Sequence, residues 1–167
     1  AEIPGGSTVE QMQPRLAETA KILWKTYLAL TLIEIIALRI GGLDLFDAVC
    51  HTFSTVATGG FSPHNGSVGV FNNIYIEGII IVFMFFGGIN FALHSQIVRG
   101  NFSGVFKNPE FRAYCSMLVI GILLVTWGLT RVSPEGDAGE AFRSAAFTVV
   151  SIQTTTGFVT DDFNIWP

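Results

Sequence analysis

The sequence predicts an all-α integral membrane protein in which one structural unit occurs twice, the second time in truncated form. Three observations support this prediction: charge is sparse, three apolar segments can cross a bilayer, and two shorter segments end in similar glycine-phenylalanine turns. Half of the 167 residues are hydrophobic and only 13% are charged, whereas soluble domains carry about 25% charged residues. We therefore expect most of the chain to lie in lipid.

The three apolar segments each approach the length of about 20 helical residues that a bilayer requires. We expect helices over residues 17–40, 74–96 and 111–130. The first is the weakest candidate because it contains Lys25, Glu34 and Arg39. Lys25 and Arg39 lie near its ends, where long side chains can reach the membrane surface. Glu34 lies deeper, either as a functional charge or paired with another helix near the outer interface.

Basic residues are distributed unevenly between these segments. They precede or open the first segment and occur again between the second and third, whereas residues 41–73 contain no Lys or Arg. The positive-inside rule therefore places the N-terminal segment and the loop 97–112 in the cytoplasm. It places residues 41–73 and 131–167 on the periplasmic side.

Two segments on the predicted outer side are apolar but too short to cross the membrane. Each opens with an aspartate followed three residues later by a second acid, a pattern that starts helices. The pairs are Asp44 with Asp47, and Asp137 with Glu140. We predict short re-entrant helices over 44–56 and 139–152, each returning toward the outside as an extended strand.

The two short helices and their turns form an internal repeat with an offset of 97 residues. Gly60 corresponds to Gly157 at this offset, and the first long segment corresponds to the third. The repeating unit is a long helix, a re-entrant helix, an extended turn and a second long helix. We therefore expect a connecting segment at 1–16, a complete unit at 17–96, a cytoplasmic loop at 97–112 and an incomplete unit at 113–167.

The chemistry of the turns points to a monovalent cation. Non-helical backbone at membrane depth is tolerated only where it is buried in protein or lines a water-filled path. Backbone carbonyls can replace the water shell of a cation there, and glycine permits the positive φ angles that turn successive carbonyls toward one axis. We expect the phenylalanine to anchor each strand. Neither turn contains the carboxylates that Ca²⁺ or Mg²⁺ would require.

Three stretches resemble the Trk/Ktr/HKT superfamily of potassium transporters: HTFSTVATGGFSPHNGS, FFGGINFALH and SIQTTTGFVTDDFNIWP. The resemblance extends over essentially the whole chain. It implies four M1–P–M2 repeats, each a helix, a pore helix and a helix, around one pore. This chain would hold the second repeat and the first part of the third. The implied filter residues are Thr58, Gly59, Gly60 and Phe61 in one strand, and Thr155, Thr156, Gly157 and Phe158 in the other.

The same resemblance implies potassium uptake across the bacterial inner membrane, with no cofactor and no metal beyond the transported K⁺. It also implies a homodimer of the full-length protein and a cytosolic ring of nucleotide-binding regulatory subunits.

Two other functions are compatible with a membrane protein of this kind. An integral membrane enzyme would need a nucleophile–base pair, paired carboxylates or metal ligands, and Ser54, His51 and the aspartates form no convincing set. The three histidines also lack metal-ligand spacing. A purely structural subunit would leave the duplicated turn unexplained. Nucleic-acid binding is not expected because there is no basic stripe.

A few further residues have two readings each. Asp161 and Asp162 either concentrate cations at the outer mouth or are solvated loop acids. Asn90 and His94 are candidates for lining an inner cavity, while the neighbouring Gly87 and Gly88 favour close helix packing.

Overall fold

The computed structural model describes residues 7–132, 137–161 and 166, and in this part of the chain all regular structure is helical. The predicted all-α fold is confirmed. The elements are α1 (Ser7–Ile40), α2 (Leu45–Val56), the 3₁₀ turn η1 (Ser67–Phe71), α3 (Ile74–Gly87), α4 (Phe91–Val98), α5 (Phe102–Lys107), α6 (Pro109–Val132) and α7 (Ala138–Gln153).

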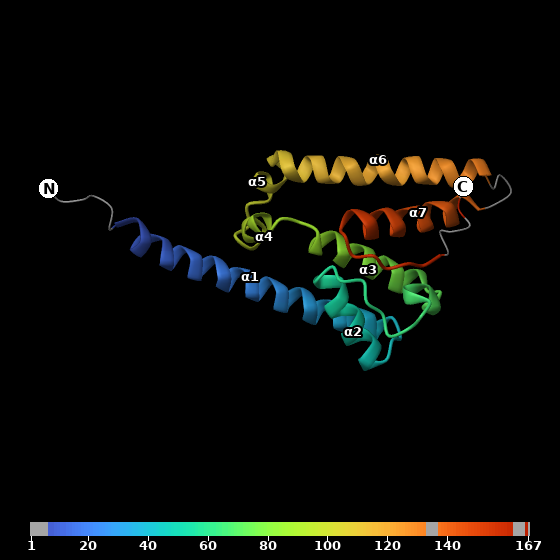
Figure 1. The fold of residues 1–167 in the computed structure, drawn as a ribbon, viewed down its shortest axis with the longest axis horizontal. Coiled ribbons are helices and arrows are strands. Elements are labelled where there is room, and N and C mark those ends of the chain that lie inside the picture. The colour runs from blue at the N-terminus through green and yellow to red at the C-terminus, as the bar shows by residue number, and fades with distance from the viewer. Residues whose placement is uncertain (1–6, 133–136, 162–165, 167) are drawn as a thin grey trace.

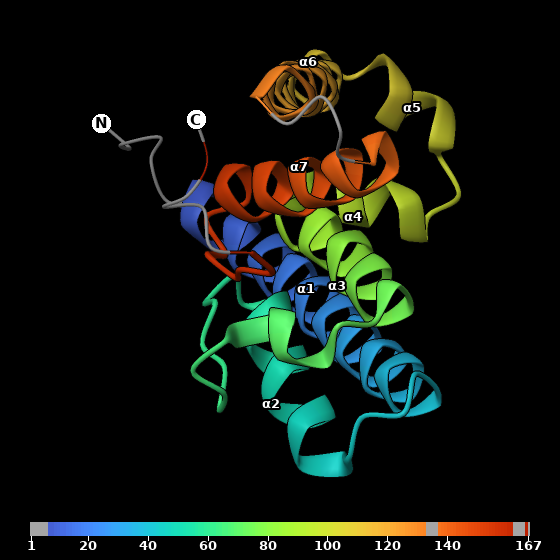
Figure 2. The ribbon, with the colours of Figure 1, turned by 90° about the vertical axis from the view of Figure 1, so that its right-hand side faces the viewer.

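The helices form two groups that meet at α3. The first group consists of α1, α2 and α3, and the second consists of α6 and α7 (Figure 1). Figure 2 shows α2 on one side of α1 and α3, with α7 and then α6 on the other side. Because α3 contacts both α2 and α7, it joins the two short helices that precede the turns.

One hydrophobic core cluster runs through both groups, and a smaller one contains Ile89, Leu93 and Val105. Leu38 of α1, Ile80 and Met84 of α3, Phe147 of α7 and Phe158 beyond α7 belong to the larger cluster, and none is more than 1% exposed. Burial of side chains of this size contributes about 1.5–3 kcal/mol each in water. The two predicted units are therefore packed against one another.

The short helices α2 and α7 agree with prediction to within one residue at each end. Asp44 caps α2, its Oδ1 accepting a hydrogen bond from the Asp47 amide at 2.7 Å. Asp137 caps α7 in the same way, with its Oδ1 3.0 Å from the Gly139 amide nitrogen. These caps satisfy amides that the first helical turn leaves without a partner.

The prediction of one continuous helix over residues 74–96 is wrong. Helix α3 ends at Gly87, α4 begins at Phe91, and their axes meet at 109°. The Asn90 side chain starts α4 by accepting a hydrogen bond from the Ala92 amide at 3.0 Å. At Gly88, a Cβ atom would lie 2.7 Å from Tyr114 Oη and 2.9 Å from Thr154 Cγ2. The glycine therefore does serve close packing, but at the end of a helix.

Among the described residues, α6 alone is long and apolar enough to cross a membrane by itself, and α3 with α4 qualifies if the bent pair is one span. Helix α1 does not meet this test, in line with the charges that made it the weakest prediction. Large apolar side chains are exposed along α6, including Ile120, Leu124 and Trp127. Such a surface is expected where a helix faces lipid.

Candidate functional site

The two predicted turns have the same backbone conformation. Thr58 and Gly60 have φ angles of 51° and 68°, and at the 97-residue offset Thr155 and Gly157 have φ angles of 61° and 86°. Each turn therefore contains a threonine and a glycine in the left-handed region, with one residue between them. Few non-glycine residues adopt positive φ, and a β-branched residue there is unusual.

Equivalent hydrogen bonds close both turns. The amide of Thr58 donates to the Thr55 carbonyl, and the amide of Thr155 donates to the Ile152 carbonyl, both at 3.0 Å. In the next position, Gly59 donates to the Ser54 carbonyl at 2.7 Å and Thr156 donates to the Ser151 carbonyl at 2.9 Å. The repeat is thus present in the backbone as well as in the sequence.

A buried serine ties each turn back to its helix. Ser54 Oγ accepts a hydrogen bond from the Phe61 amide at 2.5 Å. Ser151 Oγ donates to the Phe158 carbonyl at 2.7 Å. The partners are equivalent at the 97-residue offset, although the serine accepts in one turn and donates in the other.

The two turns lie in direct contact. A Cβ atom built on Gly60 would come within 1.9 Å of the Thr156 carbonyl oxygen and 3.1 Å of the Gly157 carbonyl carbon. Only glycine fits this close approach. The structure therefore brings the two sets of predicted site residues together, although nearly 100 positions separate them in the chain.

The phenylalanines at the ends of the turns differ in their surroundings. Phe158 is 1% exposed and belongs to the core, as expected for an anchor, whereas Phe61 is 82% exposed. The prediction that both rings anchor their strands is therefore wrong for Phe61 within the described residues.

Each turn directly follows the C-terminal end of a helix. Helix α2 ends at Val56, two residues before Thr58, and α7 ends at Gln153, two residues before Thr155. The C-terminal end of a helix carries a partial negative charge of about half an elementary charge. Both turns are therefore located where the backbone favours a cation.

Residues after the second turn bind the loop that follows the first. The Gly69 amide donates to the Val159 carbonyl at 3.2 Å, and the Val159 amide donates to Ser67 Oγ at 3.3 Å. Sequence reasoning did not find this link, because no pattern relates η1 to residues 92 positions away. The interaction fixes the second strand against the first unit.

His51 contacts the second turn and the residue that follows the first, and the sequence prediction gave it no role. It is fully buried, its Nδ1 is 2.8 Å from the Asp47 carbonyl oxygen, and its Nε2 is 3.0 Å from Ser62 Oγ. Its ring stacks on that of Phe158 with centroids 5.7 Å apart. The only sequence signal was its position inside a short helix before the turn.

The acidic residues near the turns are engaged in different ways. Asp161 is exposed and accepts a hydrogen bond from Ser144, while Asp162 lies outside the described residues. Glu77 of α3 forms an ion pair with Arg143 of α7 at 3.3 Å. Glu34 is fully buried, and neither of its carboxylate oxygens forms a hydrogen bond within the described part of the chain.

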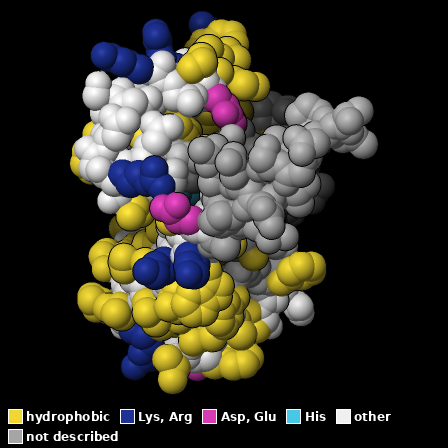
Figure 3. All heavy atoms as spheres, turned by 90° about the vertical axis from the view of Figure 1, so that its left-hand side faces the viewer, with side chains coloured by type: hydrophobic (Ala, Val, Ile, Leu, Met, Phe, Trp, Pro, Cys, Tyr) yellow, Lys and Arg dark blue, Asp and Glu magenta, His cyan; other side chains and the backbone are white. Residues whose placement is uncertain are grey.

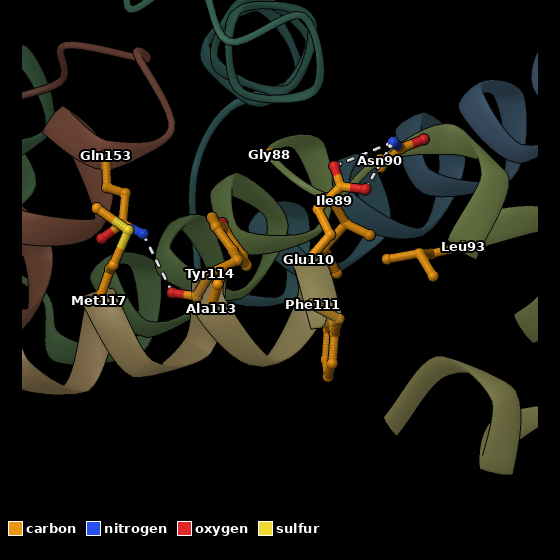
Figure 4. Close-up of a pocket in the computed structure, with 10 residues that line it drawn as sticks. All are labelled: Gly88, Ile89, Asn90, Leu93, Glu110, Phe111, Ala113, Tyr114, Met117 and Gln153. Atoms are coloured by element: carbon orange, nitrogen blue, oxygen red, sulfur yellow. Dashed lines mark hydrogen bonds between the residues drawn. The ribbon is translucent and has the colours of Figure 1, made fainter. Parts of the chain in front are cut away.

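Asn90 and His94 line two different pockets, the second of about 570 Å³. Asn90 donates to the Glu110 carboxylate at 3.0 Å beside a pocket of about 370 Å³ at the bend between α3 and α4 (Figure 4). Gln153, the last residue of α7, lines the same pocket. His94 is buried, with its Nε2 3.0 Å from the Phe86 carbonyl oxygen. The described His, Cys, Asp and Glu side chains form no group of three suited to a metal.

Comparison with known proteins shows the family of the chain. Residues 6–167 match the TrkH family, described as "Cation transport protein". The chain belongs to the TrkH family. It is 39% identical over its whole length to the Trk system potassium uptake protein TrkH of Escherichia coli K12, of which it covers 35%. It is 34% identical over its whole length to the potassium uptake protein TrkG of the same strain, of which it covers 34%.

A solved structure of a TrkH-family protein has the same fold. The potassium transporter TrkH from Vibrio parahaemolyticus superposes with a TM-score of 0.86 at 41% identity. The match covers 92% of this chain and 34% of that protein. The chain therefore spans about one third of the length of the TrkH-family proteins that it matches.

Proposed function

We propose that this chain is part of a potassium uptake protein and supplies two strands of its K⁺ selectivity filter. The observation that carries the proposal is the repeated backbone of the two turns, which have left-handed residues at Thr58 and Gly60, and at Thr155 and Gly157. The potassium transport named for the relatives supports the choice of ion.

The proposed mechanism is passive permeation through a ring of backbone oxygens. Carbonyl groups of residues 58–61 and 155–158 take the place of the water around K⁺, so removal of that water costs little free energy. The C-terminal ends of α2 and α7 add partial negative charge next to each turn. No covalent step is required, which favours a transporter over an enzyme.

A closed ring needs more strands than this chain supplies. Four-fold pseudo-symmetry would require two further turns from the rest of a longer protein. The proposed organisation retains a connecting segment at 1–16, a full repeat at 17–96, a loop at 97–112 and a partial repeat at 113–167.

A structural subunit remains a poorer explanation, because it gives no reason for strained turns in contact at the ends of two helices.

The turns are proposed to face the periplasm, with the α4–α5 end in the cytoplasm of a bacterial cell and the helices in its inner membrane. Figure 3 views the end where α4 and α5 lie, and Lys and Arg side chains are spread over this face beside hydrophobic ones.

Cysteines introduced at the exposed residues Asn65 and Ser103 test the orientation. An impermeant thiol reagent should label only the former from outside whole cells, and labelling of Ser103→Cys from outside would contradict it.

Two partners follow from the family resemblance. They are a second copy of the full-length protein and a cytosolic ring of nucleotide-binding subunits. The α5 helix and its flanking residues are the part of this chain that we propose for contact with such a ring, because Arg99, Lys107 and Arg112 cluster there in sequence.

The filter proposal is tested by replacing each glycine in the full-length protein. Gly60→Ser or Gly157→Ser should lower K⁺ selectivity over Na⁺ more than total transport, because a Cβ at positive φ costs roughly 1–2 kcal/mol. A tenfold change in selectivity requires about 1.4 kcal/mol. Thr58→Ala should have less effect, since it leaves the backbone carbonyl in place. Uptake of K⁺, Rb⁺ and Na⁺ is measured in a strain without other potassium systems.

Surface expression is measured alongside uptake. If both glycine variants reach the membrane normally and retain the parent's K⁺/Na⁺ ratio, the turns are not the filter.

A further inference from the structure

One buried side chain, His51, contacts Phe158 of the second turn and Ser62 next to the first. Its Nε2 lies 3.0 Å from Ser62 Oγ, and Ser62 directly follows Phe61 at the end of the first turn. Its ring stacks on Phe158 at the end of the second turn, with the ring planes 30° apart. His51 itself lies in α2, the helix that precedes the first turn.

We propose that His51 is a positioning residue that fixes the two turns relative to each other and thereby determines the ion selectivity of the site. The inference rests on the proposed filter function, and it adds a residue outside the two turns. His51 does not touch the ion in this proposal and acts only through Ser62 and Phe158.

The hydrogen bonds of His51 define the form of its ring. Nδ1 faces the Asp47 carbonyl oxygen at 2.8 Å, which can only accept, so Nδ1 carries a proton. Burial without a carboxylate partner favours the neutral ring, in which Nε2 accepts the proton of Ser62 Oγ at 3.0 Å. Ser62 Oγ in turn accepts a hydrogen bond from the His64 amide at 3.1 Å. The Asp47 carboxylate binds His64 instead, at 2.9 Å.

Packing holds the ring in this position. Phe71 meets the His51 ring edge-on with centroids 5.2 Å apart, and it meets His64 in the same way at 5.5 Å. His51 therefore has little freedom to follow a displaced strand. Because Gly60 lies against the Thr156 carbonyl, a shift of either turn moves carbonyl groups of the other. Selectivity depends on how many carbonyls face the ion and how closely.

The experiment measures the K⁺/Na⁺ uptake ratio of the full-length protein with three single variants and one double variant. His51→Phe retains an aromatic ring against Phe158 but loses both side-chain hydrogen bonds. Ser62→Ala removes the link between His51 and the first turn, together with the hydrogen bond that Ser62 Oγ accepts from the His64 amide. Each should lower the ratio by about three- to tenfold, the range that a typical hydrogen bond controls. The double variant should be no worse than the more affected single variant, because both remove one connection. His51→Gln, which keeps a polar group able to reach Ser62, should recover part of the ratio.

A matched control separates positioning from loss of folding. His94 is also buried and hydrogen-bonded to a backbone carbonyl, but that carbonyl belongs to Phe86 of α3 and not to a residue of either turn. His94→Phe should leave the K⁺/Na⁺ ratio unchanged whatever its effect on protein yield. An equal fall in the ratio for His94→Phe would overturn the proposal.

The decisive result comes from Ser62→Ala, which is the mildest change. This variant tests the proposal even if His51→Phe protein fails to reach the membrane. An unchanged ratio in well-expressed Ser62→Ala protein would refute the role of His51. If Gly157→Ser alters selectivity in the same assay while Ser62→Ala does not, the filter stands and only the positioning role fails. If neither glycine variant alters it, the proposed function itself fails.

Discussion

Thr58 and Thr155 combine a β-branched side chain with left-handed backbone, at φ angles of 51° and 61°. Such a conformation costs of order 1–3 kcal/mol and persists only where the surrounding structure enforces it. Here the enforcing contacts are the hydrogen bonds from each threonine amide to the end of its helix. The same strain at two equivalent positions is easier to explain by a shared function than by chance.

The two glycines are expected to respond differently in the uptake assay. A Cβ at Gly60 would meet the Thr156 carbonyl oxygen at 1.9 Å, whereas a Cβ at Gly157 would have no heavy atom within 4 Å among those described. Gly60→Ser therefore adds a clash to the cost of positive φ, and we expect it to lower the K⁺/Na⁺ ratio and surface expression further than Gly157→Ser. The reverse order would show that the contact between the turns is not as described.

At the residue scale, the sequence predicted the glycines and threonines of both turns but not their neighbours. The 97-residue offset was sufficient because Gly60 and Gly157 must adopt φ values that other residues avoid. The connection of His51 to Ser62 and Phe158 depends on how two distant segments pack. No local pattern in the sequence indicates how these distant segments pack, so the role of His51 could be recognised only in the structure.

Helices α3 and α7 are joined by an ion pair between Glu77 and Arg143. The Glu77 side chain is 5% exposed and that of Arg143 is 32% exposed, with 3.3 Å between Oε2 and Nε. Glu77 also lies in the first turn of α3, where the positive end of the helix favours an acid. The pair therefore fixes α7 against α3.

Removal of Arg143 should destabilise the protein more than removal of both charges. Arg143→Met leaves the buried Glu77 carboxylate without its partner, at a cost of about 1–3 kcal/mol, below the 3–5 kcal/mol for a fully buried pair. We expect a lower melting temperature for the detergent-solubilised full-length protein, partly restored in the double variant Glu77→Gln with Arg143→Met. If the double variant melts below Arg143→Met, the pair does not act in this way.

At the element scale, capping signals predicted the short helices well and hydropathy predicted the second long segment badly. Asp44 and Asp137 define helix starts through local hydrogen bonds, so their effect is visible in the sequence. The break after Gly87 lies inside a continuous apolar run, where hydropathy registers no change. Glycine is compatible with a packed helix and with a helix end, so the sequence does not distinguish the two. In the structure Gly88 follows the end of α3 and also packs closely against Tyr114 and Thr154.

The helices of the described residues pack around a core that contains side chains from both predicted units. Phe158 of the second turn lies in that core against the first unit, while Phe61 of the first turn is exposed. The sequence predicted the repeat, but not that the second strand would be anchored through His51, Ser67 and Gly69 of the first unit. These contacts arise only when the two units are assembled.

The central claim is that the two turns bind a dehydrated monovalent cation through their backbone oxygens. The most direct measurement is a crystal structure of the full-length protein in Rb⁺, an analogue of K⁺ that is located by its anomalous scattering. We expect an Rb⁺ peak coordinated by carbonyl oxygens from both residues 58–61 and residues 155–158, and a weaker peak in Gly157→Ser. Rb⁺ bound elsewhere in a transport-competent protein, with no peak at the turns, would contradict the claim.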